Sequence, residues 1–332
     1  MRPPVDENRA RLAVLARVVA KPDGDYLRQI DLDNLELGSF FRRYASPPEP
    51  VDLDSRSSIR EDVVIQELAR LLADHPSDVV RVLDVCCGAG SLPRKVLRSV
   101  GPDVARIEYH AVDRDTGCVE TLKSLRFEFT GFSDFRIMQR QASDLADFEQ
   151  GGADLIVLNN ALHEISPHLY PELFSNFNCL LQPVRGRICV VDMESLPADS
   201  PEAIAINWSA AEVRTFLRAA GFSPEVTLHQ KQTIVYQAHA RHVPEGIDEG
   251  AIRLVIREML LGKLNAAINL RRQLDAALAR GADEFRSWLV ITGSIARLSE
   301  VLAAMSASDD ASKRNESGAT NRSVAGDELL LK

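Results

Sequence analysis

Apolar residues in the middle of the chain recur with two different periods, and the two periods alternate along the sequence. From residue 79 onward, short runs rich in Val, Ile and Leu are separated by stretches whose apolar residues recur every three to four positions. The first pattern is typical of buried strands and the second of amphipathic helices. The alternation predicts an α/β fold with a doubly wound, mostly parallel sheet. The expected strands are Val80–Val85, Arg106–Val112, Phe135–Met138, Asp154–Leu158 and Arg187–Val191.

Two helix starts and a pair of strands complete this core. Ser58 with Glu61, and Ser209 with Glu212, have the spacing of a capping box, so we expect helices to begin near both serines. Two further strand-like runs, around residues 224–228 and 233–238, are separated by a short polar segment and predict a closing hairpin. Residues 58–242 are therefore expected to form one core around a seven-stranded sheet.

The segments outside this core have other patterns. Residues 1–57 combine a helical stretch with acidic and Pro-rich segments, which predicts an N-terminal cap. Residues 243–306 hold two long helical patterns separated by Gly281, which predicts a helical hairpin. Residues 307–332 are mostly polar and predict a disordered tail. The hairpin could cover a pocket, form a homodimer or bind a protein partner, and the sequence leaves these alternatives open.

The composition narrows the class of protein. The formal net charge of -9 disfavours nonspecific attraction to nucleic acid. No apolar run is long enough for a membrane span and the first residues lack the apolar stretch of a secretory signal, so we expect a cytoplasmic protein without membrane contact. The five cysteines include no Cys-x-x-Cys pair and are expected to be reduced, mostly buried thiols.

The most specific segment runs from Val82 to Pro93, where an apolar strand leads into a turn of small residues and then a helix. Small residues let the backbone approach a ligand, and the start of a helix supplies free N–H donors. This arrangement predicts a cofactor-binding turn. Reading the turn as the fingerprint of an NAD-dependent oxidoreductase gives Gly88-x-Gly90-x-x-Pro93, which is incomplete because that fingerprint needs Gly or Ala where Pro93 stands.

The segment Asp84-Val-Cys-Cys-Gly-Ala-Gly90 resembles the first motif of the class I S-adenosylmethionine-dependent methyltransferases, which have a Rossmann-like fold. Cys86 stands where that family usually has its first glycine. The resemblance implies that Asp84, Cys86, Gly88 and Gly90 contribute to binding S-adenosyl-L-methionine, and the later segments follow in the family's order.

Four polar residues after later strands carry the rest of this resemblance. It implies that Asp113 accepts hydrogen bonds from both ribose hydroxyls of the cofactor, and that Asp144 accepts one from the adenine amine. By the same resemblance, Asn159 and Asn160 would line the methionine end. Asp115 is expected instead to cap the helix that follows it.

His163 and Glu164 are the candidate catalytic residues, because either could remove the proton that is released when a hydroxyl or amine is methylated. The alternative is that this segment only orders its loop. We expect no required metal, since His163 and His168 lack the i, i+4 spacing of a zinc-binding pair. Tyr170 and Trp208 are expected to pack in the core.

The sequence thus predicts methyl transfer to an O, N or C nucleophile whose identity it leaves open, with a small molecule favoured as acceptor. The alternatives are a catalytically inactive methyltransferase-like scaffold that binds a protein partner and an NAD-dependent oxidoreductase.

Overall fold

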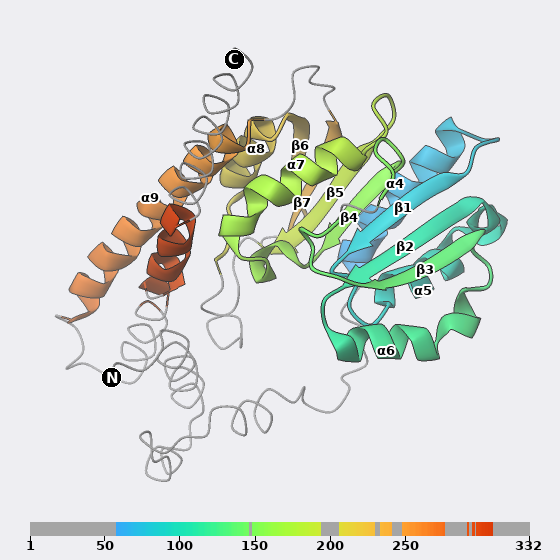
Figure 1. Cartoon of the computed structure of the whole chain (residues 1–332), viewed down its shortest axis with the longest axis horizontal. Coiled ribbons are helices and arrows are strands. Elements are labelled where there is room, and N and C mark those ends of the chain that lie inside the picture. The colour runs from blue at the N-terminus through green and yellow to red at the C-terminus, as the bar shows by residue number, and fades with distance from the viewer. Residues whose placement is uncertain are drawn as a thin grey trace, which may run out of the picture.

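The computed structural model describes residues 58–145, 148–193, 206–229, 233–240, 248–275, 291, 294–295 and 297–307. The expected N-terminal cap and residues 308–332 lie outside these ranges. A seven-stranded sheet with the order β3-β2-β1-β4-β5-β7-β6 forms the centre (Figure 1). The strands are β1 (Val80–Val85), β2 (Ile107–Asp113), β3 (Asp134–Gln139), β4 (Leu155–Asn159), β5 (Arg187–Met193), β6 (Phe222–His229) and β7 (Thr233–Ala240).

The first five strands run parallel to one another, while β7 pairs antiparallel with β5 and with β6. The expected doubly wound, mostly parallel sheet and its closing hairpin are therefore present. The strand order reverses between β1 and β4. In sheets of this type a ligand binds at such a reversal, outside the carboxyl ends of the strands.

Helices cover both faces of the sheet, and alternate residues of each strand pack against different helices. Val82 of β1 belongs to a core that includes the helices on one face, whereas Leu83 packs with those on the other. The first group is α4 (Ser58–Asp74), α5 (Ser91–Ser99) and α6 (Thr116–Ser124). The second group is α7 (Tyr170–Leu180), α8 (Ala210–Ala219) and α9 (Glu249–Asp275).

Local sequence signals fix several of the helix starts. Ser209 and Glu212 form the expected capping box at α8, with the Ser209 backbone N–H donating to the Glu212 carboxylate over 2.7 Å. Asp115 caps α6, as its position suggested, by accepting from the Cys118 backbone N–H over 2.8 Å. Because α6 follows β2 directly, this cap also fixes the backbone beside Asp113.

The C-terminal helical segments pack against the same core. Residues 294–295 and 297–307 are helical, like α9, and α9 contacts both α7 and α8. Their buried residues share one cluster with Phe216 of α8; these are Ile252, Ile256, Leu260, Leu298, Val301 and Met305. The turn expected at Gly281 lies outside the described residues. No helix in the described part of the chain is long and apolar enough to cross a membrane.

Two further expectations concern the core. Tyr170 and Trp208 pack inside it, as predicted: Trp208 Nε1–H donates to the Tyr170 hydroxyl over 3.0 Å, and that hydroxyl donates to the Leu162 carbonyl. All five cysteines are free thiols. Their expected burial is only partly correct, because Cys87 and Cys189 are buried whereas Cys179 is exposed.

Candidate functional site

The turn after β1 adopts backbone conformations that suit glycine. Gly88 and Gly90 have φ angles of 57° and 85°, in the left-handed region. A Cβ at Gly90 would also lie 2.4 Å from Leu122 Cδ2, so that position has no room for a side chain. A Cβ at Gly88 would meet nothing within 4 Å. The backbone at Gly88 therefore borders open space, as a turn that cradles a ligand requires.

Cys86 occupies the first glycine position of this turn and itself has a φ of 60°. Residues with a Cβ adopt that conformation at a cost, so the fold holds Cys86 in a strained geometry. Burial, together with the negative charges of Asp113 and Glu164, raises the pKa of its thiol to about 12. Cys86 is therefore a neutral, partly buried thiol that packs against the core to which α7 contributes.

Asp113, at the end of β2, points toward the turn. Its Oδ2 accepts from the Gly88 N–H and its Oδ1 from the Asp115 N–H, each over 2.8 Å. A carboxylate has about four lone-pair positions, so both oxygens keep acceptor capacity for a ligand. The residue is only 9% exposed. The two main-chain bonds thus place a buried carboxylate beside the open space at Gly88.

Asp84 lies beneath the turn. Its Oδ2 accepts from the Tyr109 hydroxyl over 2.7 Å, while Oδ1 is buried and has no hydrogen-bond partner. Burial raises the pKa of Asp84 to about 7, against the lowering effect of the Tyr109 hydrogen bond. The nearby charge of Asp113 raises this pKa further. Tyr109 was not predicted as a partner, although its register opposite Val82 places it on the same face as Asp84.

The loop after β3 runs past the end of β2, because the Arg140 N–H donates to the Asp113 carbonyl over 2.9 Å. Asp144 follows four residues later. Its carboxylate lies 4.0 Å from Arg140 Nη1 and is 65% exposed. Asp144 therefore stands on a loop that is attached to the site while its own side chain lies in solvent.

Asn159 ends β4 and Asn160 follows it, at the point where the strand order reverses. The Asn159 Oδ1 atom is buried and has no hydrogen-bond partner. Asn160 has a φ of 58°, and its N–H donates to the Val191 carbonyl over 2.6 Å. A buried amide oxygen without a donor costs about 1–3 kcal/mol, so the Asn159 oxygen suits a ligand that brings an N–H group.

His163 and Asp192 form a buried pair at the ends of β4 and β5. The His163 Nδ1 lies 2.7 Å from Asp192 Oδ1, and the His163 N–H donates to Asp192 Oδ2 over 3.0 Å. The His163 side chain is 1% exposed. Asp192 was not predicted from the sequence. The available signal was its place at the carboxyl end of a parallel strand, like Asp84 and Asp113.

Glu164, in contrast, is exposed. Its negative charge contributes to the raised pKa values of the Cys86 and Cys118 thiols, after the larger effects of burial and of Asp113. The structure thus brings Glu164 to the predicted cofactor-binding turn and buries its neighbour His163. Among the residues with a described position, no cluster of His, Cys, Asp and Glu could hold a metal ion.

The sheet order, the glycine turn and the carboxylate at the end of β2 together define a class I methyltransferase fold. Residues 57–230 match a family model described as a methyltransferase domain, and the chain belongs to this family. No curated protein matches the chain.

Solved structures are similar to part of the chain at low identity. The CurJ carbon methyltransferase is 16% identical over 55% of this chain and 54% of its own, with a TM-score of 0.45. An N1-methyltransferase from Burkholderia thailandensis, solved with 1,6-didemethyltoxoflavin and S-adenosylhomocysteine, is 19% identical over 61% of this chain and 86% of its own, with a TM-score of 0.44. The chain spans about half the length of the carbon methyltransferases it matches.

Proposed function

We propose that this protein transfers the methyl group of S-adenosyl-L-methionine to an O, N or C nucleophile of a small molecule. The observation that carries the proposal is the contact between the Asp113 carboxylate and the Gly88 N–H. This contact joins the end of β2 to the turn after β1, the two elements that would bind the adenosyl group. The backbone of that turn borders open space at Gly88. The family match supports this function over the nicotinamide alternative.

The residues present fit this cofactor. Asp113 would accept hydrogen bonds from the ribose hydroxyls through its remaining lone pairs. The unpartnered Asn159 oxygen would accept from the ammonium group at the methionine end, beside Asn160. Asp144 would approach the adenine amine from its exposed loop. Asp84, Cys86, Gly88 and Gly90 would shape the turn and support it.

The cofactor supplies a methyl group that is already activated for transfer. The chain's own task is then to align the acceptor, exclude water and take up a proton where the acceptor releases one. With Nδ1 of His163 bound to Asp192, proton transfer would take place at Nε2, and the carboxylate would stabilise the charged imidazole. Glu164 is the second candidate base, because it is exposed and close to the turn.

The additions to the core would shape the acceptor pocket. We propose that residues 58–242 form the methyltransferase core, with residues 1–57 as a cap and residues 243–306 as a helical hairpin beside it. The contact of α9 with α8, and the core cluster that α9 and residues 297–307 share, support a fixed position for these helical segments.

A labelling experiment tests the function although the acceptor is unidentified. The full chain is incubated with cell extract and S-adenosylmethionine that carries a deuterated methyl group, and small molecules are examined by mass spectrometry. We expect at least one species to gain a single labelled methyl group with the native protein and with Asp115→Asn, whose asparagine can still cap α6. Asp113→Asn should label it far more slowly. A folded native protein that binds S-adenosylhomocysteine but labels nothing would favour the inactive scaffold.

A further inference from the structure

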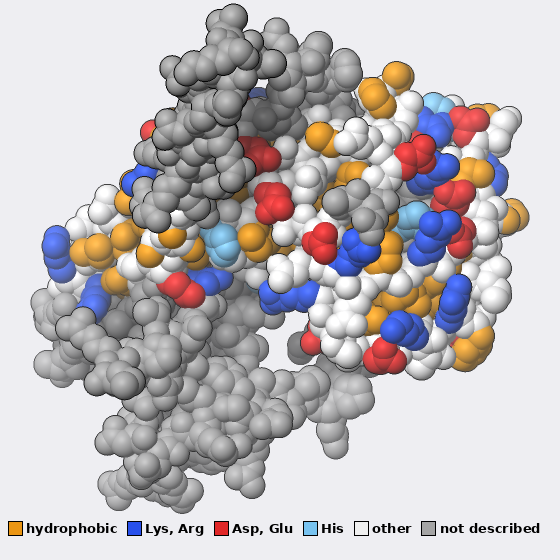
Figure 2. Space-filling view, viewed as in Figure 1, with side chains coloured by type: hydrophobic (Ala, Val, Ile, Leu, Met, Phe, Trp, Pro, Cys, Tyr) orange, Lys and Arg blue, Asp and Glu red, His pale blue; other side chains and the backbone are white. Residues whose placement is uncertain are grey.

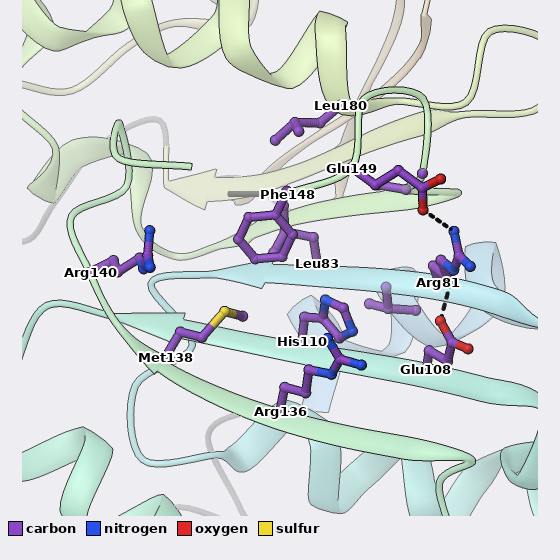
Figure 3. A pocket seen from close by; sticks show the side chains of 13 residues that line it. Arg81, Leu83, Glu108, His110, Arg136, Met138, Arg140, Phe148, Glu149 and Leu180 are labelled. Atoms are coloured by element: carbon purple, nitrogen blue, oxygen red, sulfur yellow. Dashed lines mark hydrogen bonds and ion pairs between the residues drawn. The ribbon is translucent and has the colours of Figure 1, made fainter. Parts of the chain in front are cut away.

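A cavity of about 370 Å³ lies on the face of the sheet formed by β1, β2 and β3 (Figure 3). Register places Leu83, His110 and Arg136 side by side across the three strands. The connection from β3 to β4 forms one wall and contains no helix in its described residues. The cavity is lined by Arg81, Val82, Leu83, Glu108, His110, Arg136, Met138, Arg140, Phe148, Glu149, Gly152, Ala153 and Leu180.

This cavity lies beside the proposed cofactor site and shares with it only the contacts of Arg140, whose N–H donates to the Asp113 carbonyl and whose Nη1 lies 4.0 Å from Asp144. Arg81 and Glu108 lie near the amino ends of their strands, whereas the cofactor-binding turn follows the carboxyl end of β1. None of Cys86, Gly88 and Asp113 lines the cavity. In the space-filling view, basic side chains lie around hydrophobic ones over this part of the sheet (Figure 2). A ligand here would therefore bind the chain at a second place.

The two arginines on the amino-end side of the cavity are paired differently. Arg81 is held by two carboxylates, with Nε 2.7 Å from Glu108 and Nη1 2.9 Å from Glu149. Arg136, whose partner Asp134 lies opposite Glu108 in register, donates from Nε to Asp134 over 2.6 Å. A guanidinium carries five N–H donors, so both Nη groups of Arg136 keep donors for a ligand. Arg136 is therefore suited to bind a carboxylate, which guanidinium binds through two parallel hydrogen bonds.

The middle of the cavity is apolar, with Leu83, Met138, Phe148 and Leu180 around it. The Phe148 ring lies 5.6 Å from the His110 ring, and both line the same space (Figure 3). Aromatic rings and the methionine sulfur attract a further flat ring. The cavity volume falls in the range that holds small organic molecules.

His110 adds one polar group to this apolar region. Its Nε2 atom is buried and has no hydrogen-bond partner. Burial and the charge of Arg136 lower the pKa of His110, so the imidazole is neutral at pH 7 and its ring nitrogens comprise one donor and one acceptor. A ligand with a polar atom beside its ring would supply the missing partner.

We propose that this cavity binds a planar aromatic carboxylate. The ring lies between Phe148 and Met138 over Leu83, and the carboxylate binds the Nη groups of Arg136. The proposal does not depend on the methyltransferase function, because it uses none of the residues assigned to the cofactor.

Titration of the full chain with 2-naphthoate, followed by calorimetry, tests this inference. We expect saturable binding of one molecule per chain, about 10-fold or more weakened by Arg136→Met, since a hydrogen bond to a charged group contributes about 1.5–3 kcal/mol. Phe148→Ala should weaken it as well, and Arg136→Lys should restore part of the affinity that Arg136→Met loses. Arg126→Met, at an exposed arginine that does not line the cavity, is the matched control and should bind like the native chain. Thermal unfolding of each variant shows whether it is folded.

Two further measurements identify the site and the chemistry. 2-Naphthalenemethanol lacks the carboxylate and should bind more weakly than 2-naphthoate. Saturating S-adenosylhomocysteine should leave 2-naphthoate binding in place. Absence of saturable binding, equal affinity in folded Arg136→Met, or displacement by S-adenosylhomocysteine would each overturn the proposal.

Discussion

The two halves of the proposed active site position their acidic groups in different ways. At the ends of β1 and β2, main-chain N–H groups hold Asp113, and these donors come from residues within a turn or a helix start. At the ends of β4 and β5, Asp192 accepts from the His163 imidazole as well as from the His163 main-chain N–H. The first arrangement is built for a ligand that brings its own donors. The second is a buried side-chain pair of the kind that orients an imidazole.

The largest effect is expected at the β4–β5 side. If His163 is the base, His163→Ala should lower the rate of methyl transfer to the acceptor in cell extract about 10²- to 10⁴-fold. The affinity for S-adenosylhomocysteine should change little. His163→Gln can keep a hydrogen bond to Asp192 without acting as a base, so it separates proton transfer from packing. His168→Ala is the control. Unchanged transfer in a folded His163 variant would assign the segment a structural role and leave Glu164 as the candidate.

The β1–β2 side should show a distinctive dependence of stability on pH. The pKa of Asp84 is about 7 in the folded protein, against 3.8 for an ordinary aspartate, so the folded state binds more protons between these values. The contribution of Asp84 to the free energy of unfolding should therefore fall as pH rises from about 4 to about 7, by on the order of 4 kcal/mol, and stay constant above. The free energy of unfolding of Asp84→Asn, measured from urea unfolding at each pH, should decline less over this range. An equal decline in the native protein and in Asp84→Asn would contradict a buried Asp84 that is protonated in the folded state.

A smaller effect is expected from Asp113→Asn. The amide keeps an acceptor for the Gly88 N–H but loses the charge and one acceptor oxygen, so we expect S-adenosylhomocysteine to bind about 10- to 100-fold more weakly. Calorimetric titration measures this change. Asp115→Asn should bind as tightly as the native protein. Equal affinities of all three proteins would exclude Asp113 as the ribose ligand.

The smallest effect is expected at the turn itself. Cys86→Gly removes a side chain from a left-handed conformation that costs roughly 1–2 kcal/mol, while glycine's greater freedom in the unfolded state offsets about half of that. We therefore expect the melting temperature of Cys86→Gly to be slightly higher than that of the native protein. Its affinity for S-adenosylhomocysteine should lie within about threefold of the native value. A large loss of affinity would show that the Cys86 side chain takes part in binding.

How much the sequence could predict depends on how far apart in the chain the interacting residues lie. The strands, the Ser209 capping box and the glycine turn depend on residues that are close in sequence, and their patterns predicted them. The pattern predicts a strand from Arg106, which is wrong by one residue because Arg106 ends a 3₁₀ helix (Gly101–Arg106) that precedes β2. The pairs Asp84–Tyr109 and His163–Asp192 depend on strand order and register, which no local pattern contains. The cavity over Leu83 and His110 could not be predicted for the same reason.

The most direct test of the account is a calorimetric titration of the native chain with S-adenosyl-L-methionine, with NADH as the comparison. We predict saturable binding of one molecule of S-adenosyl-L-methionine per chain and no binding of NADH. A folded protein that fails to bind S-adenosyl-L-methionine would contradict the assignment of the turn and Asp113, and binding of NADH instead would favour an oxidoreductase.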